Sequence, residues 1–120
     1  RAAGENYIFI DKHKEIYCFE TTASKEVFMH PNQPFVHTNH YTTDLVTEES
    51  YRSESSINRF NTATKLASTI SSVNDLKKIL NQPPVFRDDN ESSTIATAIV
   101  DLNKKIFHYR LRNYSGEINL

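Results

Sequence analysis

The sequence predicts an α+β fold in which antiparallel sheet flanks two central helices. Short runs rich in β-branched and aromatic residues lie towards both ends of the chain. Between these runs, apolar residues recur every three or four positions, as on one face of an amphipathic helix. The length of 120 residues suits one domain with a buried core. We therefore expect a single layered domain over residues 1–120.

Four runs in the first third of the chain predict an antiparallel meander. Residues 7–11 and 15–20 are separated by three turn-like residues, which favours a hairpin. A third strand is expected at residues 26–30. It ends at residues 31–34, where two prolines exclude a central strand and indicate a turn. Residues 35–39 then predict a fourth strand.

The middle of the chain changes to a helical period. Residues 42–54 are polar without alternation, so we expect a loop there. Apolar residues at helical spacing predict a first helix over residues 56–70. A serine at position 72, followed three residues later by an aspartate, is a capping pattern for a second helix that carries Val73, Leu76, Ile79 and Leu80. Prolines at 83–84 end that helix, because proline has no backbone N–H to donate.

The last third predicts a closing hairpin. Residues 94–101 are mostly apolar, as in a strand that is largely buried. A short turn follows, and residues 105–111 return as the partner strand. Residues 87–93 are charged and polar, and we expect them to form the connection into this hairpin.

Composition excludes several classes of function. Fourteen basic and 15 acidic residues give a net charge of −1, which argues against a general nucleic-acid binder. No apolar run approaches the about 18 residues of a membrane span. The single cysteine cannot form an internal disulfide, which suits a reducing compartment, and we expect a cytoplasmic protein. The chain begins at Arg1 without a signal-like run, and we expect it to begin inside a longer product.

Metal and nucleotide cofactors are not expected. His37 and His40 are three residues apart in a predicted strand, which would direct their side chains to opposite faces. The other three histidines are scattered, and no metal-ligand spacing occurs. With only two glycines in the chain, there is no phosphate-binding loop of either common type.

Three residues are candidates for chemistry from their local context. Asn39 ends a predicted strand, where its amide could offer two N–H donors to an oxyanion or could satisfy a turn. Arg59 lies in the first turn of a predicted helix, where the helix dipole disfavours a cation. It could serve function or pair with a nearby glutamate. For Cys18, a buried apolar role is favoured over a nucleophile, because no adjacent basic residue lowers its pKa.

Four segments, in order, resemble the choloylglycine hydrolase and penicillin acyltransferase superfamily of N-terminal-nucleophile (Ntn) enzymes. Residues 6–22 are similar to the hairpin that ends in a Glu-Thr pattern in that superfamily. Residues 36–41 resemble the HTNH segment of isopenicillin N acyltransferase relatives. Residues 55–60 resemble the Ser-Ser-x-x-Arg-Phe helix start of bile salt hydrolases, and residues 95–109 the closing hairpin.

This resemblance implies a fold and a reaction. The fold is an αββα sandwich, and the activity is cleavage or transfer at a linear amide bond of bile-salt, penicillin or acyl-amine type. In the superfamily, a cysteine at the chain's N-terminus attacks the amide carbonyl, with its own α-amino group as base. The resemblance makes Asn39 the oxyanion donor and places Arg59 near the nucleophile. It also makes His37, His40 and Tyr41 weaker candidates for substrate binding.

The departures from the superfamily pattern shape the remaining expectations. The chain has no N-terminal cysteine, and Cys18 occupies a hairpin position. We expect the nucleophile portion of the same protein to lie upstream as the partner of this C-terminal portion, which would be inactive alone. A role for Arg87 follows only from a loose match to the Ser-Ile-Cys-Arg segment of acyltransferases. Exposed apolar surface could also support homo-oligomers. The competing hypotheses are a non-catalytic α+β binding module and a degenerate homologue without a nucleophile.

Overall fold

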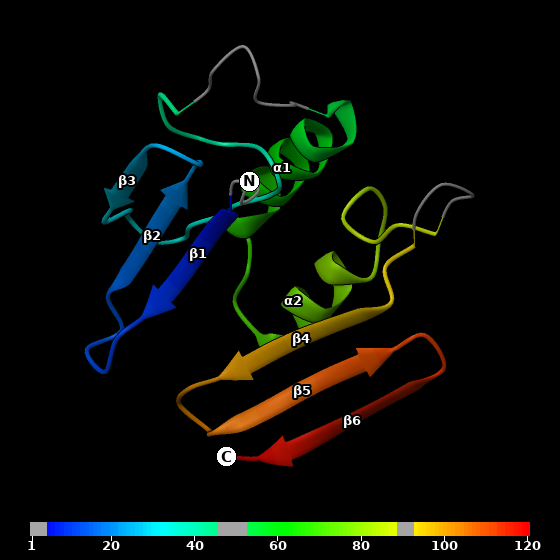
Figure 1. Cartoon of the computed structure of the whole chain (residues 1–120). Coiled ribbons are helices and arrows are strands. Elements are labelled where there is room, and N and C mark those ends of the chain that lie inside the picture. Colours follow the sequence, from blue (N-terminus) through cyan, green and yellow to red (C-terminus); the bar gives the residue numbers. More distant parts are fainter. Residues whose placement is uncertain (1–4, 46–52, 89–92) are drawn as a thin grey trace. The chain divides into compact units, whose positions relative to one another are not determined.

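The computed structural model describes residues 5–45, 53–88 and 93–120, and it confirms the α+β fold class. Its elements are shown in Figure 1. In chain order they are β1 (Glu5–Ile10), β2 (Ile16–Thr21), β3 (Glu26–Met29), α1 (Glu54–Ala67), α2 (Val73–Leu80), β4 (Ala96–Asp101), β5 (Ile106–Leu111) and β6 (Tyr114–Asn119). The chain divides into two compact units, residues 1–68 and residues 69–120. The αββα sandwich implied by the resemblance stays a prediction.

In the first unit, three strands form an antiparallel sheet of order β1-β2-β3. Ile8 pairs with Cys18 and Phe19 with Phe28, so the three predicted strands are confirmed. The hairpin between β1 and β2 is closed by Asp11, whose Oδ1 accepts hydrogen bonds from the backbone N–H of His13 at 2.8 Å. Such an aspartate stabilises a turn by bonding to the backbone that follows it.

The predicted fourth strand at residues 35–39 is wrong, because this stretch runs as irregular backbone. Its backbone polar groups form hydrogen bonds with side chains, and not with the backbone of a neighbouring strand. The carbonyl oxygen of Thr38 accepts a hydrogen bond from Nδ2 of Asn6 at 3.3 Å. Hydrogen bonds between side chains and backbone compete with the backbone hydrogen bonds that join strands, and in this stretch they take their place. Because the backbone is irregular, the side chains of this segment do not alternate between two faces as they would in a strand.

Both predicted helices are confirmed, and the first begins and ends earlier than predicted. Helix α1 begins at Glu54, inside the stretch predicted as a loop, and ends at Ala67. Of that predicted loop, residues 46–52 lie outside the described residues. The capping pattern before α2 is also confirmed, since Oγ of Ser72 accepts from the backbone N–H of Asp75 at 3.2 Å and donates to its carboxylate at 2.8 Å.

In the second unit, α2 packs against β4 of an antiparallel sheet of order β4-β5-β6. The predicted hairpin is confirmed, with Ile99 of β4 opposite His108 of β5. Strand β6 was missed by the sequence analysis. Its Gly116 is opposite Tyr109, and a Cβ atom at Gly116 would lie only 2.6 Å from the Tyr109 hydroxyl oxygen. A larger residue at this position would therefore require the Tyr109 side chain to move.

Within the three described stretches, no helix is both long and apolar enough to cross a membrane.

Candidate functional site

The two predicted catalytic residues are in direct contact in the first unit. Oδ1 of Asn39 accepts a hydrogen bond from Nη2 of Arg59, which extends from α1, at 2.7 Å. A guanidinium group only donates hydrogen bonds, so the amide atom facing Arg59 must be the oxygen. The NH₂ group of Asn39 is thereby directed away from Arg59. Asn39 is an exposed residue.

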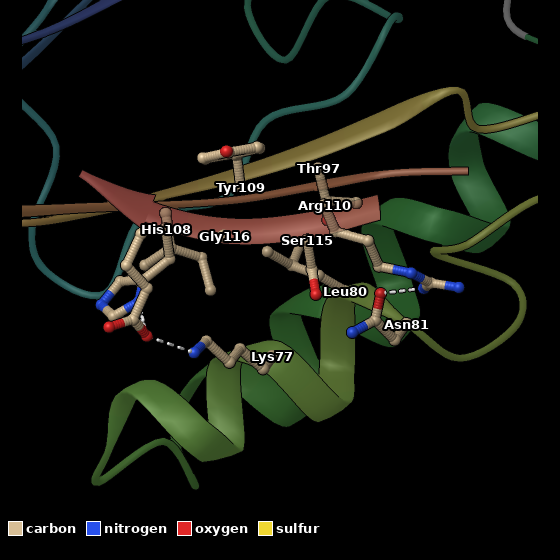
Figure 2. Close-up of a pocket in the computed structure, with 11 residues that line it drawn as sticks. Lys77, Leu80, Asn81, Thr97, His108, Tyr109, Arg110, Ser115 and Gly116 are labelled. Atoms are coloured by element: carbon tan, nitrogen blue, oxygen red, sulfur yellow. Dashed lines mark hydrogen bonds and ion pairs between the residues drawn. The ribbon is translucent and has the colours of Figure 1, made fainter. Parts of the chain in front are cut away.

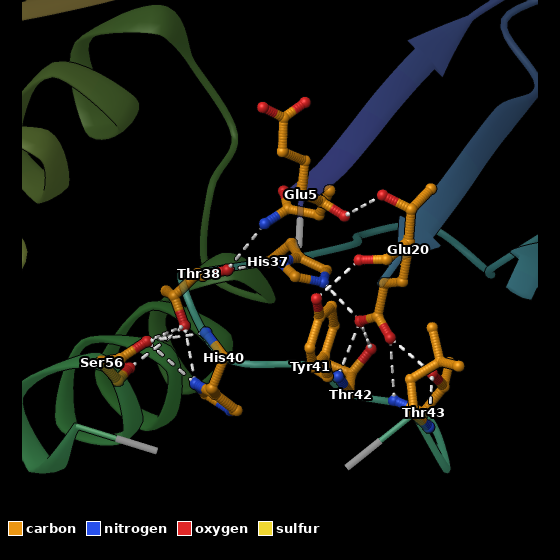
Figure 3. Close-up of polar contacts among 12 residues, drawn as sticks. Glu5, Glu20, His37, Thr38, His40, Tyr41, Thr42, Thr43 and Ser56 are labelled. Atoms are coloured by element: carbon orange, nitrogen blue, oxygen red, sulfur yellow. Dashed lines mark hydrogen bonds and ion pairs between the residues drawn. The ribbon is translucent and has the colours of Figure 1, made fainter. Parts of the chain in front are cut away.

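A buried serine of α1 holds the residues on either side of Asn39 (Figure 3). Ser56 is only 1% exposed. Its carbonyl oxygen accepts from the hydroxyl of Thr38 at 3.1 Å, and its own hydroxyl accepts from the backbone N–H of His40 at 3.1 Å. Ser56 and Arg59 are three residues apart and share one face of α1. The same helix face therefore fixes both the backbone and the side chain of Asn39.

A second anchor is the carboxylate of Glu20, which extends from β2 and is fully buried. Oε1 accepts from the backbone N–H and hydroxyl of Thr42, at 2.7 and 2.8 Å. Oε2 accepts from the backbone N–H and hydroxyl of Thr43, at 3.2 and 2.5 Å. Nε2 of His37 lies 2.6 Å from Oε1. Five polar hydrogens can thus point at one carboxylate.

These hydrogen bonds stabilise the ionised form of Glu20. Burial by itself raises the pKa of a carboxyl group, because it penalises the charged form. The hydrogen bonds from Thr43, Thr42 and His37 stabilise the carboxylate more strongly, and they lower the pKa of Glu20 from 4.5 to about 2. The carboxylate is therefore ionised at neutral pH.

The three weaker candidates around Asn39 all bond within the first unit. The side chain of His37 is 1% exposed, and its second nitrogen, Nδ1, lies 2.5 Å from the carbonyl oxygen of Thr38. The ring of His40 packs edge-on against Phe60, with centroids 5.3 Å apart. The hydroxyl of Tyr41 donates to the carbonyl oxygen of Thr21 at 2.6 Å. Their part in substrate binding stays a prediction.

Cys18 is a free, fully buried thiol, which confirms the prediction of a small buried residue. Burial raises its pKa, and the nearby negative charge of Glu20 raises it further. Both effects disfavour the thiolate that a nucleophile requires. Arg87 lies in the second unit, where its backbone N–H donates to the hydroxyl of Thr94 at 2.9 Å. A catalytic role for Arg87 stays a prediction.

The second unit contains a cavity of about 240 Å³ between α2 and the sheet (Figure 2). Its charged side chains already have polar partners. Glu117 lies 2.7 Å from Nδ1 of His108 and 3.2 Å from Nζ of Lys77, and these contacts lower the pKa of Glu117. Arg110 donates to Oδ1 of Asn81. Among the described residues, no group of histidine, cysteine and acidic side chains is arranged to hold a metal ion.

The sequence analysis missed Glu20 and Ser56 as organisers of the site. A signal existed for Glu20, because the alternation of side chains along a strand places it on the same face as Cys18, which was predicted to be buried. A carboxylate on the buried face of a strand requires partners. No comparable signal existed for Ser56, since a serine in the first turn of a helix is common.

The comparisons with known proteins give one match. The family described as "Acyl-coenzyme A:6-aminopenicillanic acid acyl-transferase" matches residues 1–115, almost the whole chain. No curated protein and no solved structure matches the chain significantly.

Proposed function

The chain belongs to the acyl-coenzyme A:6-aminopenicillanic acid acyl-transferase family, and from this premise we propose that it is part of a cysteine Ntn amidohydrolase or acyltransferase. In this proposal, it supplies the C-terminal portion of the catalytic domain. The nucleophilic cysteine belongs to the remaining portion of the same protein. The substrate is a small molecule with a linear amide or an activated acyl group.

The observation that carries the proposal is the contact between Asn39 and Arg59. When a thiolate attacks an acyl carbonyl, negative charge develops on the carbonyl oxygen, and preorganised N–H donors stabilise it. Asn39 is an exposed residue, and the bond from Arg59 to its amide oxygen orients its NH₂ group. Asn39 is thus suited to donate to this oxyanion.

Arg59 also strengthens Asn39 as a donor. A cation bonded to the amide oxygen draws electron density from the amide, and this polarises its N–H bonds. Arg59 is half-buried on α1, so its positive charge is screened less than that of a fully exposed side chain. The proposed role of Arg59 is to orient and polarise Asn39 during acyl transfer.

The test is Asn39→Ala in the complete protein, with Asn58→Ala as the matched control. Asn58 is an exposed asparagine on the same helix as Arg59, so its truncation removes the same chemical group outside the site. Turnover is followed as p-nitroaniline release from acyl p-nitroanilides, and as thiol release from an acyl-coenzyme A with 6-aminopenicillanic acid as acceptor.

Loss of one oxyanion donor typically costs about 3 kcal/mol, so kcat of Asn39→Ala is expected to fall about a hundredfold or more. The melting temperature should stay close to that of the unaltered protein, and Asn58→Ala should keep its kcat. An unchanged kcat in Asn39→Ala would remove Asn39 from the mechanism. Absence of turnover in the unaltered complete protein with both substrate types would favour the non-catalytic binding module.

A further inference from the structure

Glu20 and His37 form a buried hydrogen-bonded pair that the proposed reaction does not use directly. Their side chains are 0% and 1% exposed, and Oε1 of Glu20 lies 2.6 Å from Nε2 of His37. A buried carboxylate loses its hydration, so a well-packed apolar side chain would often serve stability as well. The presence of this pair two residues before Asn39 therefore calls for an explanation beyond stability.

Both ring nitrogens of His37 lie within hydrogen-bond distance of an oxygen atom. Nε2 faces the ionised carboxylate of Glu20, and Nδ1 faces the carbonyl oxygen of Thr38 at 2.5 Å. These two contacts fix the orientation of the ring, so His37 links the carboxylate of Glu20 to the backbone immediately before Asn39.

The carboxylate of Glu20 bonds on both sides of Asn39 in the sequence. It holds His37, two residues before Asn39, and the backbone N–H groups of Thr42 and Thr43, three and four residues after it. Figure 3 shows these bonds converging on the one side chain. Residues 37–43 form an irregular segment without strand pairing, so these bonds, with those to Ser56, define its path.

We propose that Glu20 is a positioning residue, whose carboxylate holds residues 37–43 in the geometry that presents the NH₂ group of Asn39 to the oxyanion. The proposal rests on the proposed function, since it acts through Asn39. It goes further by assigning a role to a residue of β2 that does not contact the substrate. A displacement of about 1 Å at a catalytic group can cost about a hundredfold in rate, so such a role is measurable.

The test is Glu20→Gln in the complete protein, with Glu15→Gln as the matched control. Glutamine has the shape of glutamate, but its NH₂ group would face N–H and O–H donors. Glu15 also bonds to a histidine, with 3.0 Å between Oε2 and Nε2 of His30, but their side chains are 53% and 54% exposed. The control thus makes the same chemical change at an exposed Glu–His pair.

Kinetics separate positioning from a purely structural role. For Glu20→Gln, kcat is expected to fall on the order of tenfold to a hundredfold, with KM changed by less than about threefold. Glu15→Gln should keep both constants. In the Asn39→Ala background, Glu20→Gln should lower kcat no further, because the residue through which it acts is absent. An equal fall in kcat in both backgrounds, or an unchanged kcat in Glu20→Gln, would overturn the proposal.

A milder pair of variants covers the case in which Glu20→Gln does not fold. Thr43→Val removes the hydroxyl that lies 2.5 Å from Oε2 of Glu20, and Thr43→Ser retains it. We expect a lower kcat for Thr43→Val and a kcat near the original for Thr43→Ser. Equal kcat values in the two variants would contradict the positioning role. If Asn39→Ala keeps its activity, the proposed function fails. If Asn39→Ala is inactive but Thr43→Val is fully active, the proposed function stands and only the positioning role of Glu20 fails.

Discussion

Arg59 and Asn39 are joined by a hydrogen bond of 2.7 Å from Nη2 to Oδ1, across 20 residues of sequence. This bond fixes which end of the amide faces the helix and which end faces outward. The dipole conflict expected for Arg59 does not arise, because α1 begins at Glu54 and Arg59 lies beyond its first turn. The arginine is bonded to an acceptor from another segment.

Arg59→Lys tests the polarisation of Asn39. A lysine keeps the positive charge but lacks the planar guanidinium group, and its shorter reach changes the geometry at Oδ1. We expect kcat to fall by about tenfold or more, with a smaller change in KM. Steady-state kinetics on the complete protein check this expectation. Equal activity of the lysine variant would show that charge alone is sufficient.

Ser56→Ala tests how α1 holds the Asn39 segment. The substitution leaves the backbone N–H of His40 without its buried acceptor, 3.1 Å away in the structure. An unsatisfied buried group costs about 1–3 kcal/mol, so the free energy of unfolding is expected to fall by that amount. Urea denaturation measures this change in the free energy of unfolding. Ser55→Ala, one position away on the same helix, is the control and should have a smaller effect; an equal effect would contradict this role of Ser56.

The charge of Glu20 predicts an acid-dependent loss of stability. Its pKa is about 2 in the folded protein, below the ordinary value of 4.5, so the folded state favours the ionised form. Its contribution is complete above pH 4.5, and it is lost as the pH falls towards 2. A difference of this size corresponds to on the order of 3 kcal/mol.

Denaturation of the unaltered protein and of Glu20→Gln between pH 6 and pH 2 measures this contribution. We expect a steeper loss of stability on acidification in the unaltered protein, because the glutamine variant has no carboxyl group to protonate at this position. Parallel curves would show that Glu20 does not carry the acid dependence.

Cys18 is expected to be dispensable for turnover. It is fully buried, and burial together with the charge of Glu20 raises the pKa of its thiol. Cys18→Ser should therefore keep most of the activity of the complete protein, with a modest loss of stability from the buried hydroxyl. A Cys18→Ser variant that folds but has no activity would contradict this assignment.

The fold was largely predictable because most elements leave a local signal. The capping serine before α2 and the apolar spacing of α1 depend only on neighbouring residues. Strand β6 was missed because its residues are mostly polar and include Gly116, and the ring of Tyr109 that packs at Gly116 belongs to β5. The stretch 35–39 was predicted as a strand because local pattern does not reveal bonds to distant side chains such as that of Asn6.

The site was predictable only in part, because its contacts join residues that are far apart in the sequence. Asn39 and Arg59 were singled out, but their contact joins residues that no local spacing connects. Glu20 organises residues 17 to 23 positions further along the chain. The burial that gives its carboxylate a role is a property of the tertiary structure.

The role of Asn39 as oxyanion donor is tested most sharply by kcat for Asn39→Asp in the complete protein. An aspartate has the shape of asparagine, and its carboxylate accepts the hydrogen bond from Arg59, so the local structure is retained. It has no N–H to donate and adds negative charge where the oxyanion forms. We expect a fall in kcat of about a hundredfold or more, with no loss in melting temperature. An Asn39→Asp variant that turns over at the original rate would contradict this role.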